Sequence, residues 1–211
     1  MKKLIFSFII ILSLVQFSAN AQNARVGASA GVTISDIRGT ENGFNSSGKA
    51  GGVFSLVVDL PLASRFTFQP SLSYIQKGNT YKEDANEKVL YATRYAELSP
   101  NFLYHLGSQT RGLYVGAGPY VGFNLPSKKV TDKKVGATTS TDLTFGETID
   151  KDLRGIDYGV NMLAGFRFGK VFYLSANYGL GLRNLATGDD VSGRKAKNTC
   201  FAIQFGFLFN N

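Results

Sequence analysis

Hydrophobic and polar residues alternate along most of this chain with a period of two. Between Phe166 and Asn184, for example, one set of alternate positions is mainly phenylalanine and leucine, and the set between them is mainly small or polar. Such alternation is typical of a β-strand whose two faces meet different environments. The pattern predicts eight strands, at residues 25–35, 52–60, 66–75, 91–104, 113–123, 156–168, 172–185 and 199–209.

The connections between these strands alternate in length. Those after the second, fourth and sixth strands, near residues 61–65, 105–111 and 169–171, are short, whereas the others are longer and polar, and the longest runs over 125–155. An even number of strands, with short turns at one end and long loops at the other, is typical of bacterial outer-membrane barrels. The sequence therefore predicts an all-β fold: an eight-stranded antiparallel transmembrane up-and-down β-barrel.

The polar face of the strands indicates which side meets lipid. It consists mainly of glycine, serine, threonine, asparagine and glutamine, and most lysines lie in the predicted loops. A soluble barrel would show water a surface rich in lysine and glutamate, whereas small side chains suit the interior of a narrow eight-stranded barrel. We therefore expect Leu174 and Tyr178 to face lipid, and Ser175, Asn177 and Arg183 to face the lumen.

The first residues predict export. Met1, Lys2 and Lys3 precede an apolar run and then Ser18-Ala19-Asn20-Ala21, which is the pattern of a basic region, a hydrophobic region and an A-x-A cleavage site. We expect residues 1–21 to be a cleaved signal peptide and residues 22–211 to be an outer-membrane β-barrel domain. The predicted location is the bacterial outer membrane, with the chain integral to it.

The net formal charge of +8 falls to about +6 when Lys2 and Lys3 leave with the signal peptide. Basic residues gather in two predicted loops, as Lys128, Lys129, Lys133 and Lys134 in one and Arg194, Lys195 and Lys197 in the other. Solvated loops are the ordinary interpretation. The alternative is contact with outer-membrane lipid and lipopolysaccharide through their anionic groups. Nucleic acid is not expected as a partner, because the chain is exported and carries no nucleic-acid-binding motif.

Six charged residues are predicted to point into the lumen: Arg25, Asp59, Glu97, Asp157, Arg167 and Arg183. We favour a structural network of paired charges over an ion path, since buried charges need partners and a barrel of this size is filled by its own side chains. Strand register places Asp157 opposite Arg183. His105 is the single histidine and Cys200 the single cysteine, so we expect no catalytic, cofactor-binding or metal site.

Three segments carry a family resemblance. Gly48–Gly78, Leu113–Phe123 and Ile156–Leu185 resemble strands of the PorT-type outer-membrane β-barrel family of Bacteroidota, small barrels with an architecture like that of OmpA and OmpX. The resemblance implies the barrel-assembly machinery as a partner during biogenesis, and other outer-membrane or secretion proteins as later partners. Members of the family are typically small barrels of undetermined role, and the resemblance to the founding member implies protein secretion. Our first interpretation is a non-enzymatic structural or accessory barrel serving protein secretion or a surface complex. The alternatives are a loop-presenting interaction or adhesion module and a narrow, porin-like solute channel.

Overall fold

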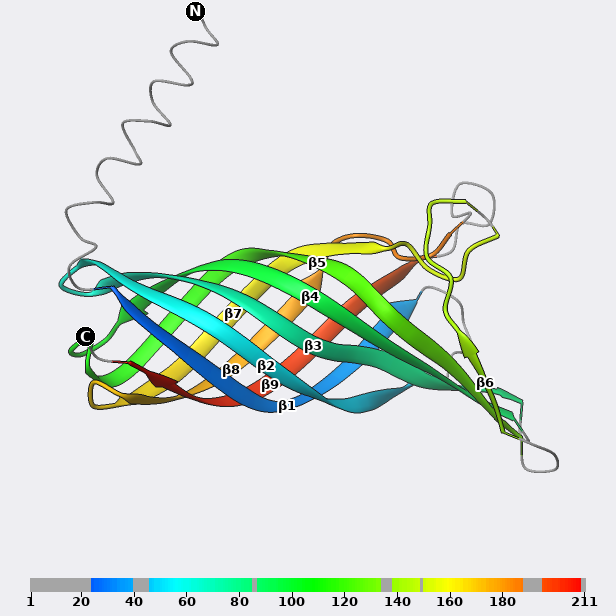
Figure 1. Ribbon diagram of the computed structural model, residues 1–211, viewed down its shortest axis with the longest axis horizontal. Helices are drawn as coiled ribbons and strands as arrows, with labels where there is room; N and C mark the ends of the chain where they lie inside the picture. The colour runs from blue at the N-terminus through cyan, green and yellow to red at the C-terminus, as the bar shows by residue number, and fades with distance from the viewer. Residues whose placement is uncertain are drawn as a thin grey trace, which may run out of the picture.

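The computed structural model describes residues 24–39, 46–84, 87–133, 138–148, 150–187 and 195–209, so the predicted signal peptide lies outside the described residues. The described chain is built from β-strands (Figure 1). They are β1 (Arg25–Gly39), β2 (Ser46–Ala63), β3 (Phe66–Asp84), β4 (Glu87–His105), β5 (Arg111–Lys133), β6 (Thr139–Asp142), β7 (Ile156–Phe168), β8 (Phe172–Gly181) and β9 (Ala196–Leu208).

Eight of these strands close into an antiparallel barrel, as predicted. Each strand from β1 to β5 pairs with the next, β5 then pairs with β7, β7 with β8 and β8 with β9, and β9 pairs with β1 to close the ring. The short turns after β2, β4 and β7 lie at one end, and we call it the turn end (Figure 1). Phe209 is there too, because its amide donates a hydrogen bond to the carbonyl of Val26 at 2.7 Å.

The strands differ from the predicted ones at the opposite end, the loop end. β3 and β4 pair as far as Asp84 and Glu87, well beyond the predicted strand limits at Ile75 and Tyr91. β6 was not predicted at all, and it continues the sheet by pairing with β5 inside the longest loop. Hydrogen-bonded ladders need no apolar face once they leave the membrane, so the hydrophobic alternation that located the strands fades before the pairing ends.

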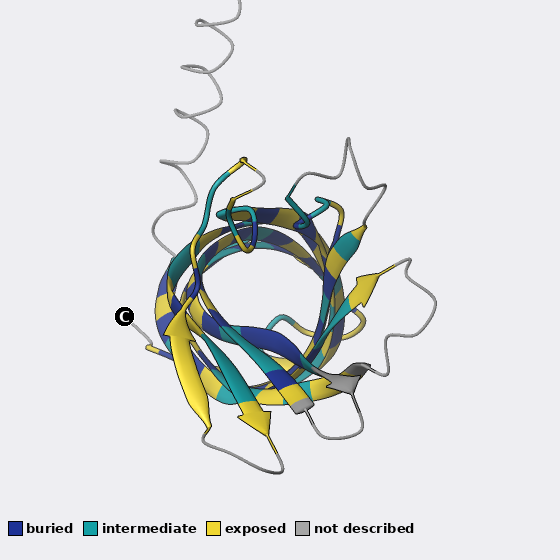
Figure 2. Cartoon of the chain, turned by 90° about the vertical axis from the view of Figure 1, so that its right-hand side faces the viewer, coloured by how far each residue is buried: buried dark blue, intermediate teal, exposed yellow. Residues whose placement is uncertain are grey.

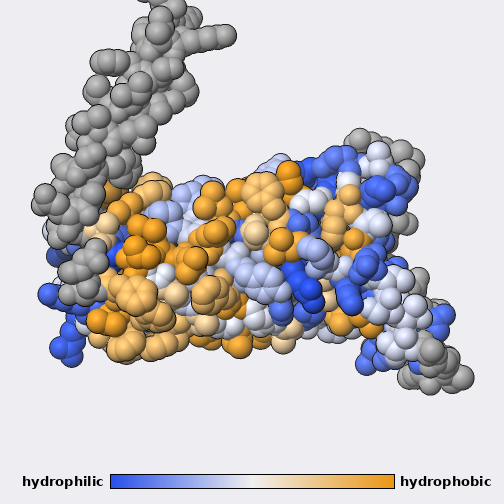
Figure 3. Space-filling view, viewed as in Figure 1, coloured by the Kyte–Doolittle hydropathy of each residue, from blue (hydrophilic) through white to orange (hydrophobic). Residues whose placement is uncertain are grey.

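The apolar face of the barrel points outward, as predicted. Leu174 is 41% exposed whereas its neighbour Ser175 is 6% exposed, and this alternation of buried and exposed residues runs round the whole ring (Figure 2). Apolar side chains form a broad band on the outer surface, with hydrophilic residues gathered mainly toward its ends (Figure 3). An oily exterior over a polar interior is the arrangement of a membrane-spanning barrel.

Glycines make room in the lumen for large inward side chains. A Cβ atom at Gly165 would lie 2.3 Å from the ring of Tyr114, and a Cβ at Gly206 would lie 2.3 Å from the ring of Tyr173. Both tyrosines are almost fully buried. At both places the inner face thus accommodates a large tyrosine from a neighbouring strand within a narrow lumen.

Candidate functional site

Charged residues from strands on opposite sides of the barrel meet at the turn end of the lumen. The Asp59 carboxylate on β2 accepts hydrogen bonds from Arg25 on β1 at 2.5 Å and from both terminal nitrogens of Arg167 on β7, at 2.5 and 3.2 Å. Gln69 donates to the same carboxylate at 3.0 Å. We call Arg25, Asp59 and Arg167 the turn-end cluster. Because β2 and β7 are not neighbours in the sheet, Arg167 spans the lumen as a strut.

The two arginines also hold the backbone of the short turns. Arg25 donates to the carbonyl of Lys170, between β7 and β8, at 3.1 Å, and Arg167 donates to the carbonyl of Gln109, between β4 and β5, at 2.7 Å. Each guanidinium therefore satisfies a turn carbonyl as well as a carboxylate. The cluster therefore fixes two of the short turns to the charged residues of the lumen.

His105 lies beside this cluster rather than in a turn, which corrects our expectation. It is the last residue of β4 and is fully buried. Its Nε2 lies 3.0 Å from the hydroxyl of Thr67, and its ring centroid is 5.8 Å from that of Tyr114. β4 continues one residue beyond the predicted limit at Tyr104, and the alternation turns that extra residue inward.

A second cluster lies farther toward the loop end. Lys77 on β3 forms ion pairs with Glu97 on β4 at 2.7 Å and with Asp157 on β7 at 3.4 Å. All three side chains are buried. We call them the loop-end cluster. Here one cation faces two carboxylates, the reverse of the turn-end cluster, where two cations face one carboxylate.

Aromatic rings and amides complete the loop-end cluster. The Lys77 ammonium lies 4.4 Å from the ring centroid of Tyr120 and 5.2 Å from that of Tyr95. The Asp157 carboxylate accepts from the Tyr120 hydroxyl at 3.2 Å and from Asn198 at 2.9 Å. Negative ring faces attract the ammonium, and the added hydrogen bonds offset part of the desolvation of the carboxylate.

Arg183, by contrast, does not join the lumen charges. β8 ends at Gly181 instead of continuing to Leu185, so the alternation that placed Arg183 inward no longer applies. Its guanidinium pairs with Glu147 of the longest loop at 2.5 Å and lies 5.8 Å from the ring of the outward-facing Tyr158. The expected Asp157–Arg183 pair is therefore replaced by the contact of Asp157 with Lys77.

Lys77 was missed by the sequence reasoning because its strand was ended at Ile75. A signal was nevertheless present: Lys77 continues the odd-numbered positions Thr67, Gln69 and Ser73, all of which point inward. Following the parity of the strand through polar residues would have placed this lysine in the lumen.

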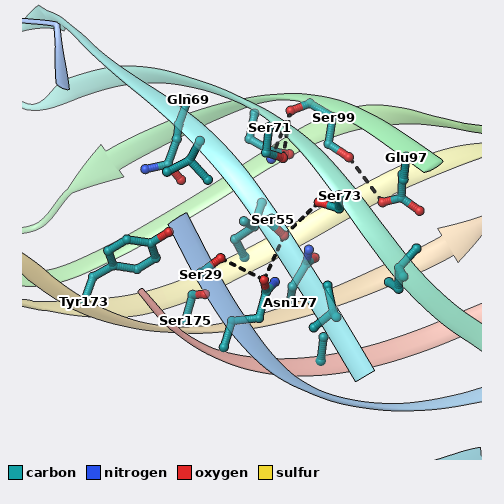
Figure 4. Close-up of a pocket in the computed structure, with 17 residues that line it drawn as sticks. Ser29, Ser55, Gln69, Ser71, Ser73, Glu97, Ser99, Tyr173, Ser175 and Asn177 are labelled. Atoms are coloured by element: carbon teal, nitrogen blue, oxygen red, sulfur yellow. Dashed lines mark hydrogen bonds between the residues drawn. The ribbon is translucent and has the colours of Figure 1, made fainter. Parts of the chain in front are cut away.

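A small polar cavity of about 40 Å³ separates the two clusters (Figure 4). Ser29 and Ser55 both donate to the side-chain oxygen of Gln204 at 3.0 Å, and Ser73 donates to Ser55 at 2.8 Å. The cavity has room for about three water molecules. Among the described residues, no group of three His, Cys, Asp or Glu side chains is placed to hold a metal ion. The arrangement suits structural water.

At the loop end, part of the longest loop is folded against the connection between β8 and β9. Leu143, Leu153 and Leu185 are buried, and the amide of Arg154 donates to the carbonyl of Leu185 at 3.0 Å. Glu147 pairs with Arg154 at 3.1 Å and also with Arg183. We call residues 143–148, 150–154 and 182–187 the loop platform. In Figure 1 it lies at the upper right, above the sheet that the ends of β3, β4 and β5 form with β6, which projects at the lower right.

A closed eight-stranded barrel with an apolar exterior and a polar, charge-paired interior defines an integral β-barrel membrane protein of the outer-membrane type. The chain belongs to the family described as outer membrane protein beta-barrel domain, whose model matches residues 20–187. Comparison with curated proteins gave no significant match.

Solved structures are similar to this chain in fold. The attachment invasion locus protein Ail of Yersinia pestis aligns over 89% of this chain and 99% of Ail, with 14% identity and a TM-score of 0.51. The outer membrane protein OprG of Pseudomonas aeruginosa aligns over 90% of this chain and 97% of OprG, with 11% identity and a TM-score of 0.50. At these identities the similarity extends to the fold alone.

Proposed function

We propose that this protein is a non-enzymatic accessory barrel that keeps its lumen closed and holds a place in an outer-membrane surface or secretion complex through its loop end. The single observation that carries the proposal is the folded loop platform. Buried leucines and the Glu147 ion pairs with Arg154 and Arg183 order this loop, and ordered loops on a rigid scaffold are the usual place for binding residues. The PorT-type resemblance supports secretion as the setting.

A loop-presenting interaction or adhesion module is the second candidate, and β6 favours it. All four residues of this strand, Thr139–Asp142, are exposed, and β6 pairs on one side with β5. An exposed sheet edge offers backbone groups to a strand of another protein. A solute channel is disfavoured, because both charge clusters lie across a lumen that is only wide enough for side chains.

The proposal is tested by cross-linking in native outer membranes followed by purification of the barrel. We expect a protein partner to be recovered with the wild type and lost when Glu147→Gln and Leu153→Ser together remove the ion pairs and a buried side chain of the loop platform. Loss of the partner only when residues 131–139 are replaced by a short Gly-Asn turn, which trims the projecting sheet, would favour the interaction module instead. Lys170→Gln, which changes an exposed charge at the turn end, is the matched control and should keep the partner.

Planar-bilayer recording supplies the second measurement. The purified wild-type barrel should show no steady conductance, because the turn-end and loop-end clusters fill the lumen. Steady, ion-selective channels together with no cross-linked partner would overturn the accessory role and favour the porin-like alternative.

A further inference from the structure

Basic side chains stand on the outer wall at one distance from the apolar band. On β1, β4 and β9 the last large exposed apolar residues toward the loop end are Ile34, Leu98 and Phe201. In each strand an exposed cation follows four residues farther on: Arg38 on β1, Arg94 on β4 and Lys197 on β9. We call Arg38, Arg94 and Lys197, with Lys49 on β2, the basic belt.

The spacing places the belt at the depth of lipid headgroups. Four residues of a strand cover about 13 Å, and a tilt of about 45° reduces this to about 9 Å along the membrane normal. The belt therefore lies just outside the hydrocarbon region. Since long loops in this class of barrel are extracellular, the lipid beside the belt is that of the outer leaflet.

Within the belt, like charges are held next to each other. Arg38 and Lys197 are directly paired residues in the β1–β9 ladder, and both side chains are exposed. Like charges directly opposite across a ladder are destabilising. Arg38 also donates to the hydroxyl of Tyr178 at 3.3 Å, so its guanidinium stands above the aromatic edge of the apolar band. An anion between the two side chains would relieve their repulsion.

A second pair in the belt has the same character. The stem of Lys49 lies over Gly78, where a Cβ atom would be 3.1 Å from the lysine Cδ. Gly78 pairs with Ala92 on β4, two residues from Arg94, so the two cations stand close together on the outer wall. Arg94 donates to the carbonyl of Pro126 at 3.4 Å. Among the described side chains, neither Lys49 nor Arg94 forms an ion pair with a carboxylate.

We propose that the basic belt binds the phosphate groups of a phosphorylated outer-leaflet lipid, with Arg38 and Lys197 holding one phosphate and Lys49 and Arg94 a second. Guanidinium and ammonium groups are the usual donors to phosphate, and cations at the membrane surface strengthen lipid binding. The acyl chains then lie along the apolar band below. This inference does not rest on the accessory role proposed above.

Native mass spectrometry of the intact barrel with diphosphorylated lipid A tests the inference. Each cation near an anionic lipid surface strengthens binding about fivefold, so Arg38→Gln with Lys197→Gln should weaken lipid binding about 25-fold. Arg38→Lys should keep most of it. Lys129→Gln is the matched control. It also removes one positive charge near the loop end, but Lys129 is not part of the basic belt and its ammonium lies over the ring of Tyr91. Heat-modifiable gel mobility checks that each variant is folded.

Two further arms identify the ligand. Dephosphorylated lipid A should bind wild type and the double variant equally weakly, and excess inorganic phosphate should not displace the intact lipid. Equal binding of lipid A by wild type and double variant would overturn the proposal. So would equal binding of lipid with and without phosphate, and displacement by inorganic phosphate would assign the site to free anions instead. None of these outcomes bears on the cross-linking test of the accessory role.

Discussion

The two charge clusters in the lumen compensate their buried charges with different kinds of partner. At the turn end, Asp59 receives two guanidiniums, and each guanidinium is also anchored to a turn carbonyl. At the loop end, Lys77 alone serves Glu97 and Asp157, and tyrosine rings take the place of backbone anchors. In the first cluster the cations have backbone acceptors besides the carboxylate, whereas in the second both carboxylates depend on one lysine for charge compensation.

This difference indicates that the stability lost when one charge is removed depends on which hydrogen-bond partners the other charges keep, more than on where in the lumen they lie. Removing one member of a buried ion pair is costly because the other charge is left without compensation. Leaving a guanidinium without its carboxylate costs less free energy when it keeps a carbonyl acceptor. Leaving a carboxylate without its cation costs more when a second carboxylate lies beside it. The loop-end cluster should therefore be the more sensitive of the two to a single substitution.

The largest effect is expected for Lys77→Met. Methionine matches the length of the lysine stem but leaves Glu97 and Asp157 facing each other, so the free energy of unfolding should fall by about 3–5 kcal/mol. Denaturant unfolding in lipid vesicles measures the change. The triple variant Lys77→Met, Glu97→Gln and Asp157→Asn should lose less than Lys77→Met alone. A single variant as stable as wild type would show that the ion pairs are not formed in the membrane.

A smaller loss is expected for Asp59→Asn. Arg25 and Arg167 lose their carboxylate but keep the carbonyls of Lys170 and Gln109 and the amide oxygen of the new side chain, so we expect a loss of about 2–3 kcal/mol. The same unfolding assay compares it directly with Lys77→Met. If Asp59→Asn proved the more damaging of the two, the proposed protection by backbone acceptors would be wrong.

The smallest effect is expected for Arg183→Gln, which tests where the charge network ends. Its partner Glu147 is 62% exposed, and ion pairs of that kind contribute under about 1 kcal/mol. A double-mutant cycle between Asp157 and Arg183 should give no coupling, whereas a cycle between Asp157 and Lys77 should give strong coupling. Strong coupling of Asp157 with Arg183 would restore the pairing that strand register alone predicts.

Much of the barrel could be predicted from sequence because lipid imposes a strict pattern. Every second residue of a spanning strand must be apolar, so the strand number, the turn positions and the outward placement of residues such as Leu174 follow from alternation. That constraint ends where the strands leave the membrane. The extensions of β3 and β4, the short strand β6 and the early end of β8 at Gly181 lie in that region and were not predicted.

The lumen was predictable residue by residue but not contact by contact. Parity places Asp59, Glu97, Asp157 and Arg167 on the inner face, yet it does not say which of them meet across the barrel. That choice depends on the stagger between strands far apart in the sequence, such as β2 with β7, and local patterning carries no information on it. The loop platform was missed for the same reason, because it is defined by contacts between distant segments. Lys77 was missed for a local reason, the early end given to its strand at Ile75, although parity would have placed it inward.

The Arg25 contacts have a consequence for how the barrel is assembled. Arg25 lies on the first strand, and the Lys170 carbonyl that it binds is 145 residues later in the chain. Contacts this distant in sequence form slowly, because the loop between them must be ordered before they contribute any stability. The ladder between β1 and β9, which we call the seam, likewise joins segments far apart in sequence, the first and last strands of the barrel. Folding should therefore finish in one late, cooperative closing step, in which the seam and the turn-end cluster are completed together.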